Sequence, residues 1–444
     1  MAKILFSSLG TGRKARGEYE HTTYKFQDSD KPYSTSFVAT ALSEHLQVDK
    51  LYLIGTSKSM WDEVYQYFAH AGNYPFNEEY WVKLEEKVST YKIGKKKINH
   101  VELNEVNNAI DAYLKYLKSS ATGGSKCFII DYGINEAEVW NNFDLFMRIG
   151  EGINEDDDVY LDITHAFRSI PLFSYLMLDL ISILKFKNNF RLAGLYYGML
   201  DVVSELGFAP IVDLSHLYNI SLWTRGAYNF INFGNGYQLA EVIDRPAISE
   251  KIRNISDMVN LNFVKDFKVE VDRLEFLLAN EHTNEHVLKY MHPYLDSFIS
   301  SFKGVSSSSE LQFALAKWYY ENKRFSQAYI CLAESIVSKL LEIYREKDIS
   351  INWSKTNRDK IKLDLISNHF KNSDEFNRIY EEYNTINKRR NNIAHAGFLN
   401  GGTYEDYIKE FSHKLINVER HVFKNNALKK IPDLYPFNKL RTNH

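Results

Sequence analysis

Short apolar segments that each end in a small or polar turn constrain the fold of this 444-residue chain more than any other feature. They recur through the first half of the chain, and helical patterns separate them. Strand-like runs that alternate with helices are typical of parallel βαβ units. The expected strands are Ile4–Phe6, Leu51–Ile54, Lys126–Asp131, Val159–Asp162 and Phe190–Tyr197. We therefore predict an α/β domain over residues 1–216.

The polar turns after these strands indicate where a ligand would bind. The carboxyl ends of parallel strands lie at one edge of a sheet, so the turns should converge there. These turns span 7–12, 55–59, 131–133 and 162–169. The last one carries a hydroxyl at Thr164 and a cation at Arg168 just before a helix begins, which favours anion binding. The alternatives are an ordinary tight turn at 7–12 and a structural turn in which Asp162 caps and His165 is buried.

A helical pattern near the C-terminus places three polar side chains at one helix end. Apolar residues recur at spacings of three and four from Asp374 to Asn392, which predicts a helix with one buried face. Gly397 is a plausible C′ residue at its end. Asn391 and His395 are four residues apart and share a face, and the side chain of Arg390 can reach the same place.

This trio suits phosphate chemistry. The helix dipole favours a protonated imidazole at a helix C-terminus, and a guanidinium matches phosphate oxygens. Together they can transfer a proton and stabilise a pentavalent phosphate. RNA supplies its own 2′-OH as nucleophile, so no metal is required. The spacing alone is weak evidence, because a chain with 14 histidines produces such pairs by chance.

Composition limits the other classes of function. The formal net charge is -3, so we expect local rather than broad contact with nucleic acid. Cys127 and Cys331 are predicted to be reduced core residues, and no set of ligands has metal-site spacing. The N-terminus lacks a signal peptide and no apolar run is long enough to span a membrane, so we expect a cytoplasmic protein.

The remainder of the chain is predicted to be helical. Residues 217–303 form a helical connector, and the Ser-rich segment Gly304–Ser309 is the clearest linker. An all-α domain follows over 304–444. Its first part, Glu310–Tyr344, should contain two amphipathic helices split near 322–324, and Lys360–Phe370 a third.

The N-terminal motifs resemble a CARF domain, a CRISPR-associated Rossmann fold. The similar segments are Ile-Leu-Phe-Ser-Ser-Leu-Gly-Thr-Gly at 4–12, the turn at 55–61 and Asp-x-Thr-His-x-x-Arg-Ser-x-Pro at 162–171. The match is closest to the subfamily with an Asp-x-Thr-His-Gly signature, although Ala166 replaces its glycine. The resemblance implies two paired domains that bind a cyclic oligoadenylate, with four adenylates the better guess and six open. It places the pocket at Ser8, Gly10, Thr11, Gly12, Thr56, Ser57, Thr164, His165 and Arg168.

The C-terminal motif, Arg390-Asn391-x-x-x-His395 followed by Ala-Gly, resembles the ribonuclease motif of HEPN domains. The resemblance implies a homodimer with composite sites that cut single-stranded RNA without metal or other cofactor. Arg390 would stabilise charge, His395 would transfer the proton and Asn391 would orient RNA or His395. The products would carry 2′,3′-cyclic phosphate and 5′-OH ends.

Both motifs in one chain predict a CARF–HEPN effector of type III CRISPR immunity, silent until a cyclic oligoadenylate binds and without a DNA or membrane partner. One alternative is a sensor whose helical domain docks a partner without cutting RNA. A second is a ring nuclease in which Thr164 and His165 assist cleavage of the activator itself. A third is a constitutive toxin-like ribonuclease, against which the large N-terminal sheet argues.

Overall fold

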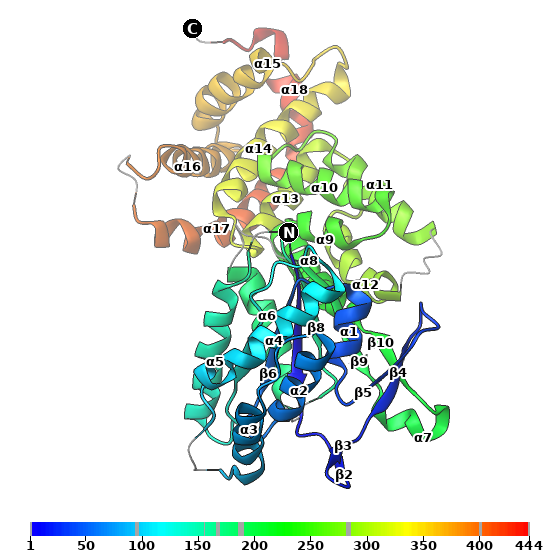
Figure 1. The fold of residues 1–444 in the computed structure, drawn as a ribbon. Coiled ribbons are helices and arrows are strands. Elements are labelled where there is room, and N and C mark those ends of the chain that lie inside the picture. Colours follow the sequence, from blue (N-terminus) through cyan, green and yellow to red (C-terminus); the bar gives the residue numbers. More distant parts are fainter. Residues whose placement is uncertain are drawn as a thin grey trace. The chain divides into compact units, whose positions relative to one another are not determined.

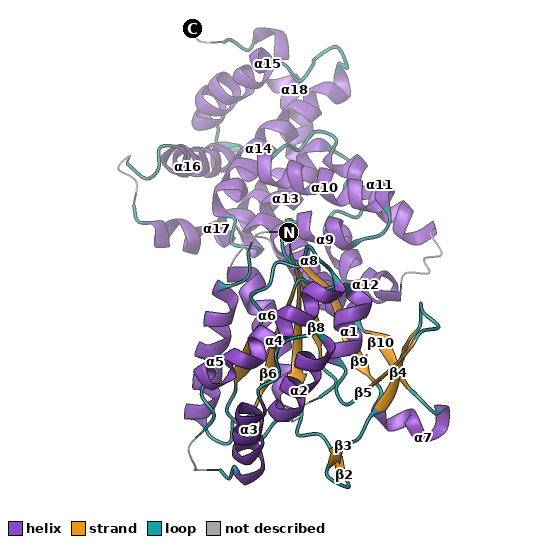
Figure 2. Cartoon of the chain, in the orientation of Figure 1, coloured by secondary structure: helices purple, strands orange, loops and turns teal. Residues whose placement is uncertain are grey.

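The computed structural model describes residues 2–93, 97–154, 156–165, 169–184, 191–280, 286–398 and 402–442. Contacts divide the chain into two compact units, Met1–Tyr218 and Asn219–His444. The N-terminal unit is built on a β-sheet covered by helices, and the C-terminal unit is helical (Figures 1 and 2). The predicted order, α/β first and all-α second, is confirmed.

An eight-stranded sheet organises the N-terminal unit, in the order β5-β4-β10-β9-β8-β1-β6-β7. Its strands are β1 (Lys3–Leu9), β4 (Thr22–Phe26), β5 (Pro32–Thr35), β6 (Lys50–Gly55), β7 (Lys126–Ile129), β8 (Asp158–Asp162), β9 (Arg191–Gly198) and β10 (Ala209–Asp213), and β2 (Lys14–Ala15) and β3 (Glu18–Tyr19) form a separate pair. Strand β1 pairs in parallel with β6 on one side and β8 on the other. The strand order therefore reverses between β1 and β8, where ligand crevices open in such sheets.

The apolar runs of the sequence are continuous because helices cover both faces of the sheet. Ile4 and Phe6 of β1 pack with α5 and α6, while Leu5 and Leu9 pack on the opposite face with α1, α2, α3 and α4. The helices of this unit are α1 (Ala39–Leu46), α2 (Trp61–Ala71), α3 (Glu78–Thr90), η1 (His100–Leu103), α4 (Asn104–Leu117), α5 (Glu136–Glu151), α6 (Ser169–Leu184), η2 (Leu200–Val202) and α7 (Val203–Leu206).

The structure extends and corrects the expected elements. Strand β1 continues to Leu9, which pairs with Gly55, so Ser7 and Ser8 lie in the strand and not in the following turn. Helix α1 begins only at Ala39, because Thr35 pairs with Thr22 in the β4–β5 hairpin. Sequence reasoning missed α3 and β10. The sheet is also mixed, because β10 runs antiparallel to β9.

One hydrophobic core runs through the C-terminal unit from Trp223 to Leu440. Its helices are α8 (Ser215–Phe233, which begins in the N-terminal unit), α9 (Tyr237–Val242), α10 (Pro246–Leu261), α11 (Phe267–Asn280), α12 (His286–Ser300), α13 (Ser308–Glu321), α14 (Phe325–Lys347), α15 (Lys355–Asp359), η3 (Lys360–His369), η4 (Phe370–Asn372), α16 (Asn377–Ala394), α17 (Tyr404–Val418), η5 (Glu419–Phe423), η6 (Asn426–Lys430), α18 (Ile431–Leu434) and η7 (Phe437–Lys439). The hydroxyl of Tyr319 donates to the Val259 carbonyl at 3.0 Å, so α13 is tied to α10. The boundary at 303/304 stays a prediction, since helices on both sides of it share this core.

Two smaller expectations can be compared directly. Cys127 and Cys331 are buried free thiols, as predicted. Within the ranges that the structure describes, no helix is both long and apolar enough to cross a bilayer.

Candidate functional site

A buried carboxylate joins β1 to β8 at the point where the strand order reverses. Asp162 ends β8 and is fully buried. It accepts a hydrogen bond from the hydroxyl of Ser7 at 2.5 Å and another from the backbone N–H of Thr164 at 2.9 Å. Burial raises the pKa of Asp162 to about 6, although hydrogen bonds from Ser7 and Thr164 act in the opposite direction. Asp162 therefore fixes both the strand pair and the start of the turn that carries the sequence motif.

Thr164 and His165, which were predicted to bind the activator, form hydrogen bonds with other strands and turns of the unit. The hydroxyl of Thr164 accepts from the N–H of Gly198 on β9 at 2.7 Å. The Nε2 atom of His165 accepts from the N–H of Val38 at 3.4 Å and lies 3.3 Å from the hydroxyl of Tyr24. Burial lowers the pKa of His165 to about 4. The ring is therefore neutral at physiological pH, and its proton sits on Nδ1 because Nε2 is the acceptor.

The turns after β1 and β6 are bonded to each other. Ser59 donates from its hydroxyl to the Leu9 carbonyl at 2.7 Å and accepts from the N–H of Thr56 at 3.0 Å. The N–H of Met60 donates to the Gly10 carbonyl at 3.1 Å. These contacts confirm that the two turns meet at one edge of the sheet. Ser59 does not cap α2, since its hydroxyl is engaged by the two turns.

The predicted activator residues divide into an exposed and a buried group. Thr11 and Gly12 are exposed and Gly10 is half-buried, whereas Ser8, Thr56 and Ser57 are buried. Arg168 and Ala166 lie outside the described residues.

The buried hydroxyls of the second turn have structural partners. Thr56 accepts from the N–H of Lys58 at 3.3 Å, and Ser57 accepts from the N–H of Ile98 at 3.2 Å. Gly12 has φ 64°, and a side chain there would meet Met60 and Tyr19. Among the predicted activator residues that the structure describes, Thr11 and Gly12 of the β1 turn are therefore the exposed ones.

Sequence reasoning missed the partners Ser7, Tyr24 and Val38. Ser7 is opposite Asp162 in the register of β1 and β8, and its signal is a polar residue at the end of an apolar strand. Tyr24 and Val38 are far from His165 in sequence, and no local pattern indicates that they meet it.

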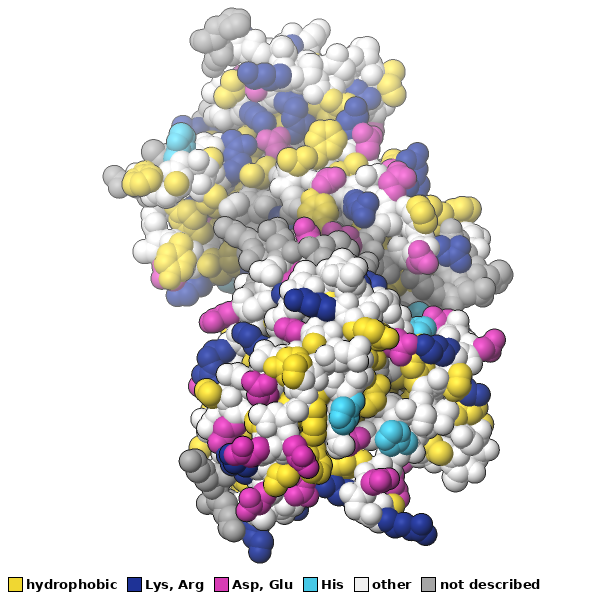
Figure 3. All heavy atoms as spheres, viewed as in Figure 1, with side chains coloured by type: hydrophobic (Ala, Val, Ile, Leu, Met, Phe, Trp, Pro, Cys, Tyr) yellow, Lys and Arg dark blue, Asp and Glu magenta, His cyan; other side chains and the backbone are white. Residues whose placement is uncertain are grey.

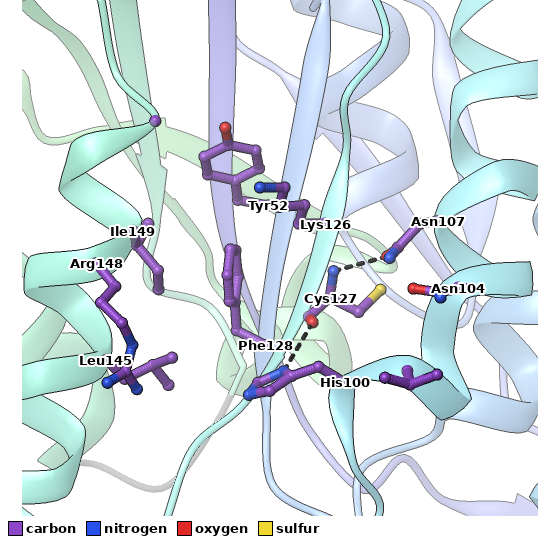
Figure 4. Close-up of a pocket in the computed structure, with 12 residues that line it drawn as sticks. Tyr52, His100, Asn104, Asn107, Lys126, Cys127, Phe128, Leu145, Arg148 and Ile149 are labelled. Carbon is purple, nitrogen blue, oxygen red and sulfur yellow. Dashed lines mark hydrogen bonds between the residues drawn. The ribbon is translucent and has the colours of Figure 1, made fainter.

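A cavity of about 400 Å³ lies at the free edge of the sheet, beside β7 (Figure 4). His100 and Asn107 reach the backbone of Cys127 from one side, at 3.4 Å from its carbonyl and 2.8 Å from its N–H. These side chains satisfy an edge strand that would otherwise offer free backbone groups. None of the predicted activator residues lines this cavity.

Helix α16 ends in a Schellman motif just where the predicted catalytic residues lie. The N–H of Gly397 donates to the Asn392 carbonyl at 2.8 Å, and that of Ala396 donates to the Ile393 carbonyl at 3.0 Å. The C′ residue is therefore Ala396, with φ 53°, and not Gly397 as expected. His395 is the C-cap and is exposed.

Arg390 is anchored on two sides. Its Nη2 donates to the side-chain oxygen of Asn391 at 2.9 Å, and its Nη1 pairs with Oε1 of Glu334 on α14 at 3.3 Å. Glu334 also pairs with Lys362 at 3.0 Å and with Arg358. Burial opposes ionisation of Glu334, but attraction to Lys362 and Arg358 prevails and its pKa is lowered. Three cations thus surround one ionised carboxylate, which leaves an excess of positive charge.

This arrangement places a fixed guanidinium and an exposed imidazole on the last turns of one helix. It can stabilise negative charge and exchange a proton with a bound phosphate ester. Asn391 supports Arg390, one residue away, whereas the sequence had suggested RNA or His395 as its partner. Sequence reasoning missed Glu334, Arg358 and Lys362, because each is far from the motif along the chain. In the space-filling view, lysine and arginine side chains gather over α15 and α18 of this unit (Figure 3).

Comparisons with known proteins find similarity in both units of the chain. Residues 4–201 match the family of CRISPR system endoribonuclease Csx1, CARF domain, and residues 219–308 match CRISPR-associated protein MJ1674, second domain. The curated protein MJ1674 of Methanocaldococcus jannaschii is 38% identical over 405 residues, or 89% of this chain. The chain spans 62% of the length of that relative.

The fold was also compared with solved structures. Enterococcus italicus Csm6 bound to cyclic hexa-2′-fluoro-hexa-dAMP aligns over 99% of this chain and 98% of that one, with 12% identity and a TM-score of 0.43.

Proposed function

We propose that this protein is a cyclic-oligoadenylate-activated endoribonuclease of type III CRISPR defence. Its similarity to CRISPR-associated protein MJ1674 and the match of its N-terminal unit to a CARF domain support this proposal. It cuts single-stranded RNA without a metal ion, as a homodimer with composite HEPN sites. The observation that carries this proposal is that Arg390 is held by Asn391 and Glu334, five residues before the exposed His395 at the end of the same helix.

In the proposed reaction, the RNA 2′-OH attacks the adjacent phosphorus. The 2′-O–P bond forms as the P–O5′ bond breaks, and the products are a 2′,3′-cyclic phosphate and a 5′-OH. The nucleophile loses a proton and the leaving oxygen gains one, and His395 mediates this transfer. Arg390 neutralises the charge that develops on the equatorial oxygens. Asn391 and Glu334 keep the guanidinium in place, so less ordering is required when RNA binds.

The activator enters at the β1 turn, where Thr11 and Gly12 are exposed and Thr164 and His165 lie at the neighbouring strand end. We propose a cyclic tetra-adenylate, and a cyclic hexa-adenylate as the other candidate. The neutral ring of His165 suits contact with an uncharged base or ribose more than with a phosphate.

The deciding experiment is cleavage of a labelled single-stranded RNA in EDTA, with no activator, cyclic tetra-adenylate or cyclic hexa-adenylate. Wild type is expected to cut with one ring only, and His395→Ala is expected to lose the activity. Cleavage without activator would contradict the proposed activation by a cyclic oligoadenylate. Cleavage that persists in His395→Ala would contradict the proposed role of His395 in proton transfer. If wild type binds a ring but cuts no RNA under any condition, the sensor becomes the better function.

A further inference from the structure

Two cavities of the C-terminal unit meet along one wall. The larger, about 710 Å³, lies between the start of α11, residues 305–308 and α15, and the smaller, about 280 Å³, lies beside α14. Val264, Lys265 and Gln312 line both. The two cavities are therefore neighbours that share these three residues, and we call them together the Lys265 groove.

The groove combines positive charge with an exposed aromatic ring. Lys265, Lys268 and Arg358 line it, together with the carboxylates of Asp266 in the larger cavity and Glu334 in the smaller one. Lys268 also pairs with Asp272. Trp353 stands at the same cavity and is 39% exposed, and the guanidinium of Arg345 lies 5.4 Å from its ring centre. Trp353 therefore presents part of an aromatic face beside several cations, and this combination suits single-stranded nucleic acid.

The groove reaches the candidate catalytic arginine through one carboxylate. Glu334 lines the smaller cavity, and its two oxygens bind Arg358, which lines the larger one, and Arg390. Arg390 Nη1 is 3.3 Å from Glu334 Oε1. A chain that lay in the groove would therefore reach Glu334, the carboxylate to which Arg390 is bound.

We infer that the Lys265 groove holds the single-stranded RNA that flanks the scissile phosphate, an inference that rests on the proposed ribonuclease function. Phosphates would contact Lys265, Lys268 and Arg358, and a base would stack on Trp353. Cationic grooves with aromatic platforms bind single strands without sequence preference, because every base has a flat face and every linkage a charge. Since Lys265 and Lys268 precede the predicted HEPN domain, the connector helices would contribute to substrate binding.

The test uses full-length protein with the double substitution Lys265→Glu and Lys268→Glu. Affinity for a fluorescent 12-nucleotide RNA is measured by anisotropy in the His395→Ala background, where the RNA stays intact. The groove variant is expected to bind about tenfold more weakly, with a shallower dependence of affinity on salt, because phosphate contacts are lost. The matched control, Lys289→Glu with Lys429→Glu, makes the same charge change at exposed lysines outside both cavities. It should bind RNA as the parent does.

Three outcomes distinguish this inference from the function on which it rests. Weaker RNA binding by the groove variant alone supports the groove, even if wild type cuts no RNA. If both variants bind RNA equally weakly, or if both bind it as tightly as the parent, the inference is wrong, whether or not cleavage is observed. A second readout uses Trp353→Ala, which should weaken binding about five- to tenfold through lost stacking. If the groove variant instead loses binding of a hexaglutamate peptide and keeps that of RNA, the occupant is an acidic protein segment and the inference is wrong.

Discussion

The two candidate sites of this chain hold their polar side chains in opposite ways. At the N-terminal site, Asp162 is fully buried, and Thr164 and His165 accept hydrogen bonds from other parts of the sheet domain. At the C-terminal site, His395 is exposed at a helix end, and the adjoining Arg390 keeps a partly exposed guanidinium. The first arrangement fixes its polar groups within the sheet domain, whereas the second leaves a guanidinium and an imidazole accessible to solvent. The proposed sensor and catalytic sites would differ in this way.

Charge follows the same division. Residues 1–218 contain 22 lysines and arginines against 29 aspartates and glutamates, and residues 219–444 contain 32 against 28. The net charges are thus -7 and +4, which sum to the -3 of the whole chain. The C-terminal unit is therefore positively charged although the whole chain is not, and we expect the local contact with RNA to lie in that unit.

The largest expected effect separates chemistry from stability. Substitution His395→Ala should reduce RNA cleavage about 10³-fold, because proton transfer to the leaving oxygen is lost. The melting temperature should change little, since the exposed imidazole buries no surface. Cleavage rates and calorimetry on the same samples check both. His413→Ala on α17, also exposed, is the control and should alter neither. A large drop in melting temperature for His395→Ala would contradict the comparison.

The next effect concerns pH at the N-terminal site. The pKa of Asp162 rises from 3.8 to about 6 on folding, so this group stabilises the fold in acid and the contribution disappears as pH rises through about 6. The pKa of His165 falls from 6.5 to about 4, so its contribution is present above 6.5 and is lost as pH falls through about 4. The two slopes oppose each other between pH 4 and 6.

Asp162→Asn should therefore expose the slope of His165. The variant is expected to lose about 3 kcal/mol more stability than wild type between pH 6.5 and 4, from two pKa units at about 1.4 kcal/mol each. Calorimetry of the N-terminal transition at several pH values measures this change. The control His165→Asn should show the reverse slope, with greater stability in acid. Parallel pH profiles for wild type and Asp162→Asn would refute the assignment.

A smaller effect tests the hydrogen bond between Tyr24 and His165. Tyr24→Phe removes a hydroxyl 3.3 Å from Nε2, while the N–H of Val38 still donates to that atom. The expected loss is about 1 kcal/mol, or about 2–4 °C in the N-terminal transition. Tyr197→Phe removes a longer bond at an exposed carboxylate, 3.5 Å from Asp201, and should have no measurable effect. Equal shifts of the transition temperature in the two variants would mean that the hydrogen bond between Tyr24 and His165 does not stabilise the fold more than the exposed one does.

The smallest effect lies at the end of α16. Ala396 adopts φ 53°, a conformation that costs alanine more than glycine. Ala396→Gly should stabilise the C-terminal unit by about 0.5–1 kcal/mol, measured as a rise in its melting temperature. Ala394→Gly, at the last residue of the same helix, should instead destabilise the unit, by at most a similar amount, because this position keeps a helical backbone. If both substitutions destabilise, the left-handed conformation of Ala396 carries no strain.

The periodic spacing of apolar residues in the sequence determined which faces of the strands and helices are buried. The alternation of Ile4, Leu5 and Phe6 between the two faces of the sheet is a property of the strand itself, and the spacing of apolar residues before Arg390 predicts a helix that ends near His395. The convergence of the turns after β1 and β6 also follows, because parallel strands place their carboxyl ends together.

Only the tertiary structure decided which polar groups meet. The bond from Ser7 to Asp162 spans 155 positions, and the contact of Tyr24 with His165 spans 141. The ion pair of Arg390 with Glu334 depends on how α14 packs against α16. Hydrophobic periods report the face that an element buries, but the order of strands and the packing of helices bring these distant side chains together. These contacts join residues far apart in the chain, so local patterns in a single sequence do not indicate which side chains meet.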